Sequence, residues 1–233
     1  MAIDLRSFTA ARVGLQRQGS SLSTSELLRF DLDHARARDA VHLELDPTSL
    51  GFDHILVKSE AKDRRTYLLR PDLGRRLQNK LQPEPCDAAI IIADGLSALA
   101  VHRHAKELLT RLLPLLDSWK LAPLIVATQA RVAIGDDIGE QLGAKLALVL
   151  IGERPGLTSP DSLGAYLTYN PKTGRNDAER NCVSNIRPEG LTYDAAAHLI
   201  HFLMTESRAR KISGVTLKSD ATPNPLLDAG SNP

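Results

Sequence analysis

The chain has 233 residues, enough to bury a substantial core as one generous domain or as a domain with a smaller appendage. Its 29 basic and 28 acidic residues nearly cancel, and aromatic residues make up only 4%, so neither attraction of the whole surface to a polyanion nor stacking on single-stranded nucleic acid is indicated. The two cysteines, Cys86 and Cys182, lie outside any CxxC spacing, and no apolar run is long enough for a signal peptide or a membrane span, so we expect a reduced protein of the cytoplasm.

The N-terminal 45 residues are predicted to form an arm and a helix. Residues 1–22 are polar and rich in glycine and serine, which favours an extended segment. Ser23 and Glu26 have the spacing of a capping box, and an apolar stripe that includes Leu28 and Leu32 predicts a helix over residues 27–43. The charges on its other face are mixed in sign, which is typical of a solvated face and also compatible with a contact surface.

Residues 53–60 are predicted to form an edge strand, and the segment that follows is dense in arginine. Arginines in such a cluster suit phosphate or carboxylate recognition, because each guanidinium is a rigid fork. Salt bridges to a partner or to acidic groups of this chain are an equally good explanation. Asp72 is a candidate N-cap of a short helix in this segment. The arginines concerned are Arg64, Arg65, Arg70, Arg75 and Arg76.

Strands and helices alternate through the centre of the chain. Apolar runs at 87–94, 122–129 and 145–152 predict buried strands, and the segments between them predict helices over 98–116 and 136–144. This order predicts an α/β fold with a parallel sheet, right-handed crossovers and flanking helices. Ser97 is the expected N-cap of the first of these helices.

A last helix over residues 192–211, with Gly214 as its C-cap, is predicted to close a domain that spans residues 46–218. Residues 219–233 are rich in proline, glycine and serine, so we expect a disordered tail.

The familiar signatures of nucleotide binding and nucleophilic catalysis are absent. No GxGxxG follows the first apolar strand, and neither GxxxxGK[ST] nor GxSxG occurs. His102 and His104 are two residues apart, so on a helix they do not face each other and make a poor metal pair. A conventional NAD enzyme, ATPase or α/β-hydrolase is therefore not indicated.

Three glycines fall four residues apart in the segment 134–144. Gly135, Gly139 and Gly143 would line one face of a helix, at a cost of up to about 1 kcal/mol each within the helix relative to alanine. A bare face of this kind allows a backbone, a flat ligand or a partner subunit to approach closely. Tight packing of the helix on the sheet explains the pattern about equally well.

Candidate ligand contacts lie where the predicted strands end. Arg131 and Val132 follow the strand at 122–129, and Glu153 and Arg154 follow the strand at 145–152. A segment over 181–187 with Cys182 is expected to reach the same rim, because ligands of open α/β sheets bind beyond the carboxyl ends of strands. The alternatives are a capping role for Glu153 and an inert place in the core for Cys182.

Five stretches of the sequence resemble the small (light) subunit of ethanolamine ammonia-lyase. They are ELLRFDLDHARARDAV (26–41), YLLRPDLGRRL (67–77), IIIADGLSALAV (90–101), RVAIGDDIGEQLGAKLALVLIGERPGL (131–157) and RNCVSNIRPEGLTYDAAAHLI (180–200). They occur in the order of the family and span roughly residues 10–215, which makes the resemblance specific.

The resemblance implies one subunit of an adenosylcobalamin-dependent lyase that converts ethanolamine to acetaldehyde and ammonia. It implies a Rossmann-like domain that covers the cobalamin from one side, while a large β/α-barrel subunit binds substrate and carries the catalytic residues. Hexamers of large–small pairs are implied as well. By motif, Val132, Glu153 and Cys182 match the cobalamin contacts of the family, and no catalytic residue or metal ligand is assigned to this chain.

Two further expectations concern the cofactor and the location. None of the seven histidines has an aspartate two positions before it, so the D-x-H-x-x-G motif is missing and the cobalamin is expected to keep its own base as lower ligand. Only about 20 residues precede the first predicted helix, fewer than in members packaged in a bacterial microcompartment, so free cytoplasm and microcompartment both remain open. The alternative function is a stand-alone flavodoxin-like module for a nucleotide or phosphate, suggested by the sheet and by the arginines of 64–76.

Overall fold

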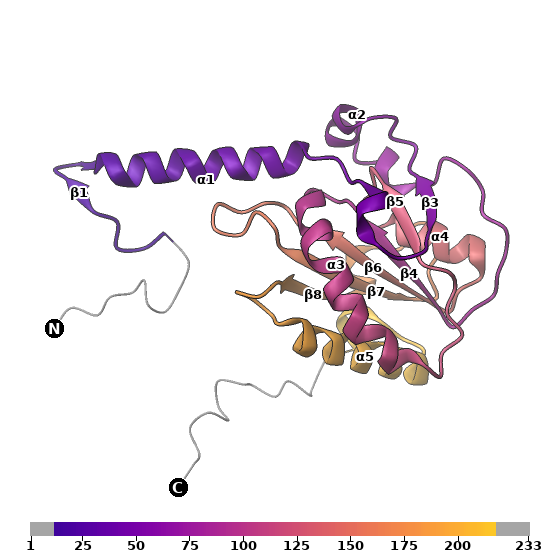
Figure 1. The fold of residues 1–233 in the computed structure, drawn as a ribbon. Helices are drawn as coiled ribbons and strands as arrows, with labels where there is room; N and C mark the ends of the chain where they lie inside the picture. The colour runs from indigo at the N-terminus through magenta and orange to yellow at the C-terminus, as the bar shows by residue number, and fades with distance from the viewer. Residues whose placement is uncertain (1–11, 218–233) are drawn as a thin grey trace, which may run out of the picture.

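A six-stranded mixed sheet forms the centre of the fold, in the strand order β3-β5-β4-β6-β7-β8 (Figure 1). The structure, a computed structural model, describes residues 12–217, so the tail predicted at 219–233 lies outside the described residues. The strands are β3 (Ile55–Lys58), β4 (Ala88–Ala93), β5 (Ile125–Thr128), β6 (Leu146–Gly152), β7 (Leu163–Tyr169) and β8 (Arg180–Ile186). The predicted α/β class is confirmed, as is the position of β3 at an edge.

The four strands β3, β5, β4 and β6 are parallel, whereas β7 is antiparallel to both β6 and β8. The parallel arrangement predicted from the strands at 87–94, 122–129 and 145–152 is confirmed for β4, β5 and β6, but the prediction that the sheet is parallel throughout is wrong, because β7 pairs antiparallel with β6 and β8. The physical reason is the length of the connections. Segments 153–162 and 170–179 contain no α-helix, and a parallel neighbour would need a crossover of about a dozen residues or more.

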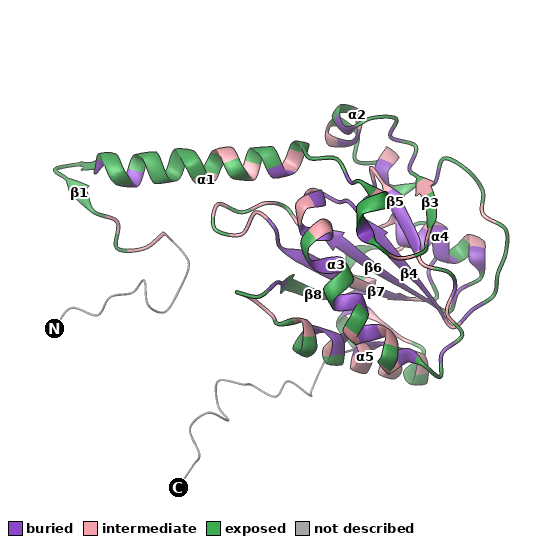
Figure 2. Cartoon of the chain, in the orientation of Figure 1, coloured by how far each residue is buried: buried purple, intermediate pink, exposed green. Residues whose placement is uncertain are grey.

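Helices cover the two faces of the sheet unequally. α3 (Ala98–Leu112) and α5 (Tyr193–Arg210) pack on one face, where a large apolar cluster includes Ile90 and Leu148. α4 (Ile134–Leu142) packs on the other face, over a smaller cluster centred on β4, β5 and β6. The central strands β4, β5 and β6 and the neighbouring β7 are almost entirely buried, whereas the edge strand β3 is mostly exposed (Figure 2). On the α4 face, however, Cys182 and Ser184 of β8 are exposed, so this end of the sheet is open.

The predicted helix starts are confirmed at Ser97 and Thr192, whose hydroxyls accept hydrogen bonds from the backbone amide of the third residue of α3 and of α5. The helix predicted to reach residue 116 changes at Leu113 into a 3₁₀ turn, η4 (Leu113–Leu116), because Pro114 cannot continue the α-helical hydrogen bonds. The prediction that Gly214 caps the last helix is wrong.

Lys211 is the C-cap of α5, in a left-handed conformation with φ of 58°. Gly214 instead begins η6 (Gly214–Thr216) with φ of 81°. A β-carbon at Gly214 would overlap the carbonyl oxygen of Ala178, so close backbone approach explains the glycine there.

The N-terminal segment extends away from the sheet (Figure 1). A short hairpin of β1 (Arg17–Gln18) and β2 (Ser21–Leu22) leads into α1 (Thr24–His42), which Ser23 caps as predicted. Leu28 and Leu32 of the predicted apolar stripe are 63% and 50% exposed, so the stripe does not pack on this chain. Figure 2 shows most of α1 as exposed. A 3₁₀ turn, η2 (Pro47–Leu50), then leads to β3.

The glycine stripe is explained by packing of α4 on the sheet. A β-carbon at Gly135 would overlap the side chain of Val149, and one at Gly139 would overlap Pro171. Gly143 is the C-cap of α4, with φ of 74°. The hypothesis that a flat ligand or a partner subunit lies against Gly135 and Gly139 is therefore wrong. None of the helices within residues 12–217 is long and apolar enough to cross a membrane.

Candidate functional site

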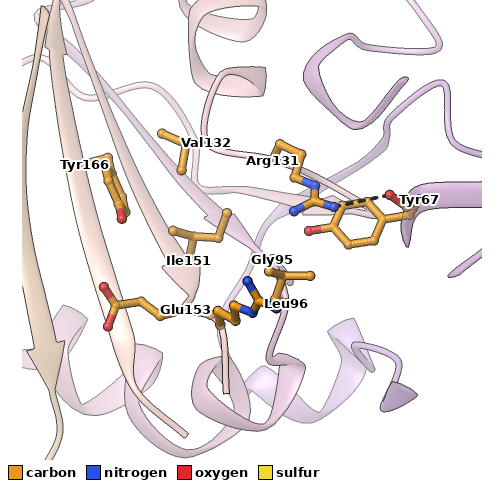
Figure 3. Close-up of a pocket in the computed structure, with 10 residues that line it drawn as sticks. Tyr67, Gly95, Leu96, Arg131, Val132, Ile151, Glu153 and Tyr166 are labelled. Carbon is orange, nitrogen blue, oxygen red and sulfur yellow. Dashed lines mark hydrogen bonds between the residues drawn. The ribbon is translucent and has the colours of Figure 1, made fainter. Parts of the chain in front are cut away.

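A pocket of about 430 Å³ opens at the carboxyl ends of β4, β5 and β6 (Figure 3). Residues 95–96 after β4, 131–132 after β5 and 151–154 at the end of β6 line it, together with Tyr67 and Tyr166. The connection after β4 leads to α3 on one face and the connection after β5 leads to α4 on the other. The two connections therefore diverge to opposite faces of the sheet at this point, which is where open α/β sheets bind ligands.

Glu153 lies at the end of the pocket formed by β6 and β7. Its Oε2 atom accepts hydrogen bonds from the Ser162 hydroxyl and, at 3.2 Å, from the backbone amide of Asn185. Among residues 12–217 no donor bonds its Oε1 atom. A β-carbon at Gly164 would stand 2.9 Å from Oε1, so the glycine leaves the room that this carboxylate occupies. The predicted capping role and a free acceptor for a ligand are thus both present, on different oxygens.

The middle of the pocket is apolar. Val132 and Ile151 point into it between Glu153 and Arg131 (Figure 3). Tyr166 of β7 closes the side beside Glu153, and burial is the main cause that raises the pKa of its hydroxyl. The prediction that Val132 and Glu153 share one rim is confirmed by this geometry. The pocket has the Glu153 carboxylate at one end, the Arg131 guanidinium at the other and a hydrophobic centre. This arrangement suits a large ligand with polar edges.

Cys182 is not at this rim. It lies near the beginning of β8 and pairs with Tyr166 in the sheet register, on the open α4 face. The thiol is exposed, although nearby protein atoms desolvate it and raise its pKa. The alternative that Cys182 is an inert core residue is therefore wrong. The segment 181–187 does reach the rim, but with Asn185, because β8 itself occupies most of that segment.

The arginine cluster divides into buried and exposed groups. Arg64 begins α2 (Arg64–Leu69) and is only 6% exposed, with its Nη1 atom 3.4 Å from the Asp94 carboxylate. Arg70 forms an exposed ion pair with Asp72, at 2.7 Å. Asp72 occupies the predicted N-cap position, at the start of the 3₁₀ turn η3 (Leu73–Arg75), but its side chain makes no capping hydrogen bond. Arg65, Arg75 and Arg76 are exposed.

Tyr67 lies between two guanidinium groups. The ring is fully buried, with the Cζ atom of Arg64 at 4.7 Å and that of Arg131 at 4.2 Å from its centre. Its hydroxyl donates to the carbonyl of Ala130, at 3.3 Å. This arrangement joins α2 to the segment after β5 and so fixes one wall of the pocket.

Asp94 holds the turn that presents Arg131 and Val132. Its carboxylate accepts hydrogen bonds from the backbone amides of Gln129, at 2.7 Å, and Ala130, at 2.8 Å. Burial raises the pKa of Asp94 to about 6, and the hydrogen bond from Ala130 and the charge of Arg64 oppose that rise. Gln129 has φ of 54°, so the carboxylate also stabilises an uncommon backbone conformation.

The segment 153–162 is anchored from the α3 face. Asp161 forms ion pairs with Arg103, at 2.7 Å, and with Arg187, at 3.6 Å, and lies 3.5 Å from Nε2 of His104. The Ser97 hydroxyl donates to the carbonyl of Pro160. These contacts fix the far end of the segment whose near end carries Glu153 and Arg154.

Comparison with known proteins identifies the family. The sequence model of the ethanolamine ammonia-lyase light chain (EutC) matches residues 2–218. The chain belongs to this family. Curated relatives named ethanolamine ammonia-lyase small subunit include proteins of Azotobacter vinelandii, 51% identical over 98% of this chain and 92% of the relative, and Bradyrhizobium diazoefficiens, 54% identical over 94% and 90%. Another, from Pseudomonas fluorescens strain SBW25, is 50% identical over 94% of this chain and 86% of the relative. The resemblance stated from the five sequence stretches is thus confirmed.

Several pocket residues of this light chain did not follow from sequence reasoning. Tyr67 reaches the pocket from a helix that was not predicted, and Tyr166 reaches it from β7, whose antiparallel direction was not predicted. One signal could have found Tyr166. If β7 and β8 are taken as an antiparallel pair, Cys182 lies opposite Tyr166 on the same face of the sheet.

Proposed function

We propose that this chain is the small subunit of an adenosylcobalamin-dependent ethanolamine ammonia-lyase, which converts ethanolamine to acetaldehyde and ammonia. The observation that carries the proposal is a pocket at the carboxyl ends of the strands, in a chain of the light chain family. Tyr166, which lines this pocket, lies beside the exposed Cys182 on the open face of the sheet. We further propose that this pocket and face form half of a cobalamin site and that a large catalytic subunit closes it.

The size of the pocket supports a shared site. A pocket of about 430 Å³ suits a drug-sized ligand, and a corrin with its nucleotide is considerably larger. The pocket would therefore hold one part of the cobalamin, while the rest lies over β7 and β8, where Cys182 is exposed. A partner surface is needed to cover what remains.

The residues present fit such a ligand. Oε1 of Glu153 is free within residues 12–217 to accept a hydrogen bond from an amide arm or a hydroxyl of the cofactor. Val132 and Ile151 offer apolar contact to a ring edge, and Cys182 is small enough to let the ligand approach the sheet. Bound adenosylcobalamin supplies the radical chemistry through homolysis of its cobalt–carbon bond. The role proposed for this chain is to bind and orient the cofactor and exclude water from one side.

Reconstitution tests the proposal directly. The chain is co-expressed with the large subunit, and ethanolamine and adenosylcobalamin are added. We expect acetaldehyde to form and a cob(II)alamin signal to appear in paramagnetic resonance. Full activity of the large subunit without this chain would contradict the assignment.

A titration separates a shared site from a complete one. Cobalamin should bind the complex more tightly than either subunit alone, because each subunit contributes only part of the contacts. Tight binding of a flavin mononucleotide by the isolated chain would instead favour the flavodoxin-like alternative. The arginines that suggested that alternative are in part engaged internally, since Arg64 pairs with Asp94 and Arg70 with Asp72.

Assembly and location complete the proposal. We propose six large–small pairs in the assembled enzyme, a cobalamin that keeps its own base as lower ligand, and a place in the cytoplasm, free or within a bacterial microcompartment. Mass measurement of the reconstituted complex checks the first point. The paramagnetic resonance spectrum of the bound cobalt checks the second, because nitrogen of the cofactor's own base can be isotopically labelled.

A further inference from the structure

Arg131 faces the pocket from the end opposite Glu153 (Figure 3). The strand order explains this placement, because Arg131 follows β5, Glu153 follows β6, and β4 lies between them. A single ligand that fills the pocket therefore meets a carboxylate at one end and a guanidinium at the other, with Val132 and Ile151 between.

The Arg131 side chain is held in place before any ligand arrives. Its guanidinium stacks on Tyr67, and its Nη2 atom donates to the carbonyl of Tyr67 at 3.3 Å. Its backbone amide donates to the carbonyl of Gly74 at 2.8 Å. A β-carbon at Gly74 would stand 2.9 Å from Cγ of Arg131, so a glycine there leaves space for the arginine stem. A fork fixed in this way loses little conformational entropy when it binds an anion.

No acidic partner neutralises Arg131 within the described part of the chain. Asp94, which follows β4 and holds the turn that carries Arg131, already accepts hydrogen bonds from two amides and pairs with Arg64. The Nε atom of Arg131 is buried without a hydrogen-bond partner among residues 12–217, and its Nη1 atom donates no hydrogen bond there. Buried polar groups are normally paired, so this guanidinium has donor capacity left for a ligand.

The net charge of the pocket also favours an anionic ligand. Two arginines, Arg131 and Arg154, line it against one carboxylate, Glu153, which leaves one positive charge in excess. Oε2 of that carboxylate is occupied by Ser162 and Asn185. The pocket therefore carries a net positive charge, which suits an anionic group of a ligand.

We propose that Arg131 binds a phosphate ester of the ligand, with Nη1 as the principal donor and Tyr67 as the residue that positions the guanidinium. The inference rests on the proposed function, since a cobalamin carries one phosphodiester, in the arm that joins its nucleotide to the corrin. The pocket then holds this arm, with the phosphate at Arg131 and a neutral donor group of the ligand at Glu153. Arginine suits the task because its fork matches two phosphate oxygens.

The test compares two ligands that differ in the nucleotide arm, which includes the phosphate. Cyanocobalamin and cobinamide, which lacks the phosphate and the nucleotide, are titrated against the complex of this chain with the large subunit, by absorption or equilibrium dialysis. The variants are Arg131→Gln and Arg131→Lys. Arg70→Gln serves as the matched control, because Arg70 is exposed and its partner is Asp72 rather than the pocket.

For Arg131→Gln we expect the dissociation constant of cyanocobalamin to rise about tenfold to a hundredfold, the range of a lost charge-assisted hydrogen bond, while that of cobinamide changes less than about twofold. Arg131→Lys keeps the charge and the aliphatic stem, so it should recover part of the loss. Arg70→Gln should match the wild type with both ligands.

Equal losses for the two ligands would overturn the phosphate assignment, because the arginine would then contact a part that both share. Dissociation of the two subunits with unchanged affinity of the intact complex would overturn it too, in favour of a carboxylate on the partner. If the wild-type complex binds neither ligand, the proposed cobalamin function itself fails. Circular dichroism of each variant confirms that the compared proteins are folded.

Discussion

Gly164 and Glu153 face each other across the β6–β7 pair, so closely that a β-carbon on the glycine would stand 2.9 Å from Oε1 of the carboxylate. Tyr166 would lie 3.1 Å from the same β-carbon. A glycine at this point therefore determines where the acceptor group of the pocket can lie. The residue at position 164 of β7 should therefore affect the ligand contact proposed for Glu153.

Replacing Gly164 with alanine should displace the Glu153 carboxylate and weaken cobalamin binding by the complex about tenfold, because a hydrogen bond of roughly 1 to 3 kcal/mol loses its geometry. The free energy of unfolding should fall by about 1 to 3 kcal/mol, the usual cost of overpacking. Titration and urea denaturation measure the two effects. Gly156→Ala is the control, since its β-carbon would meet Ser159 only at 3.8 Å. Unchanged affinity in Gly164→Ala would contradict a ligand role for Glu153.

The sequence pattern was sufficient to predict the buried strands, because a run such as Ile90–Ile92 is apolar on both faces and is found only where helices cover both sides. The antiparallel direction of β7 was not predicted, although a usable signal exists. Only ten residues, 153–162, separate β6 from β7, which is too short for a helical crossover. The short length of that segment would have predicted that β6 and β7 form an antiparallel pair.

The walls of the pocket were harder to predict, because they depend on contacts between distant segments. Val132 and Glu153 were predicted from their positions after strands, and that rule is general. Tyr67 is 64 residues from Arg131 in sequence, and no local pattern indicates that the two side chains stack. The family resemblance could not supply this contact either, because it assigns ligand contacts and not the residues that hold them.

Packing of α4 on β6 makes a separate prediction. Gly135→Ala should lower the free energy of unfolding by about 1 to 3 kcal/mol, because its new β-carbon would overlap Val149. Val149→Ala alone should also destabilise the chain, by loss of buried surface. The double variant should lose less than the sum of the two single losses, since the smaller residue makes room for the new methyl group. Additive losses in urea denaturation would rule out this contact as the reason for the glycine.

The buried ion pair between Arg64 and Asp94 should be far more important for stability than its exposed counterpart. Asp94→Ala leaves an unpaired guanidinium and two backbone amides without their acceptor, so we expect a loss of about 3 to 5 kcal/mol in the free energy of unfolding. Asp72→Ala breaks the exposed pair with Arg70 and should leave stability unchanged within the accuracy of urea denaturation. Similar losses for the two variants would contradict the difference in burial.

His104 should make the stability of the chain sensitive to acid. Burial lowers the pKa of His104 below its usual value of 6.5, and the nearby Asp161 carboxylate opposes this effect. The unfolded chain therefore binds more protons at this residue than the folded chain below about pH 6.5. The free energy of unfolding should therefore fall as the pH is lowered below about 6.5. Above that pH, His104 should not affect how stability depends on pH.

The variant His104→Asn keeps a polar group near the Tyr193 hydroxyl, which lies 2.8 Å from Nδ1 in the wild type, but removes the titrating ring. Urea denaturation between pH 5 and 7.5 should therefore show a weaker pH dependence for the variant than for the wild type. The difference in the free energy of unfolding between the two proteins should shrink as the pH falls. Only in the wild type does acid favour the unfolded state by protonating an imidazole that is buried in the folded state. His198→Asn, on the exposed side of α5, should keep the wild-type slope. A slope that is the same in all three proteins would show that another group is responsible.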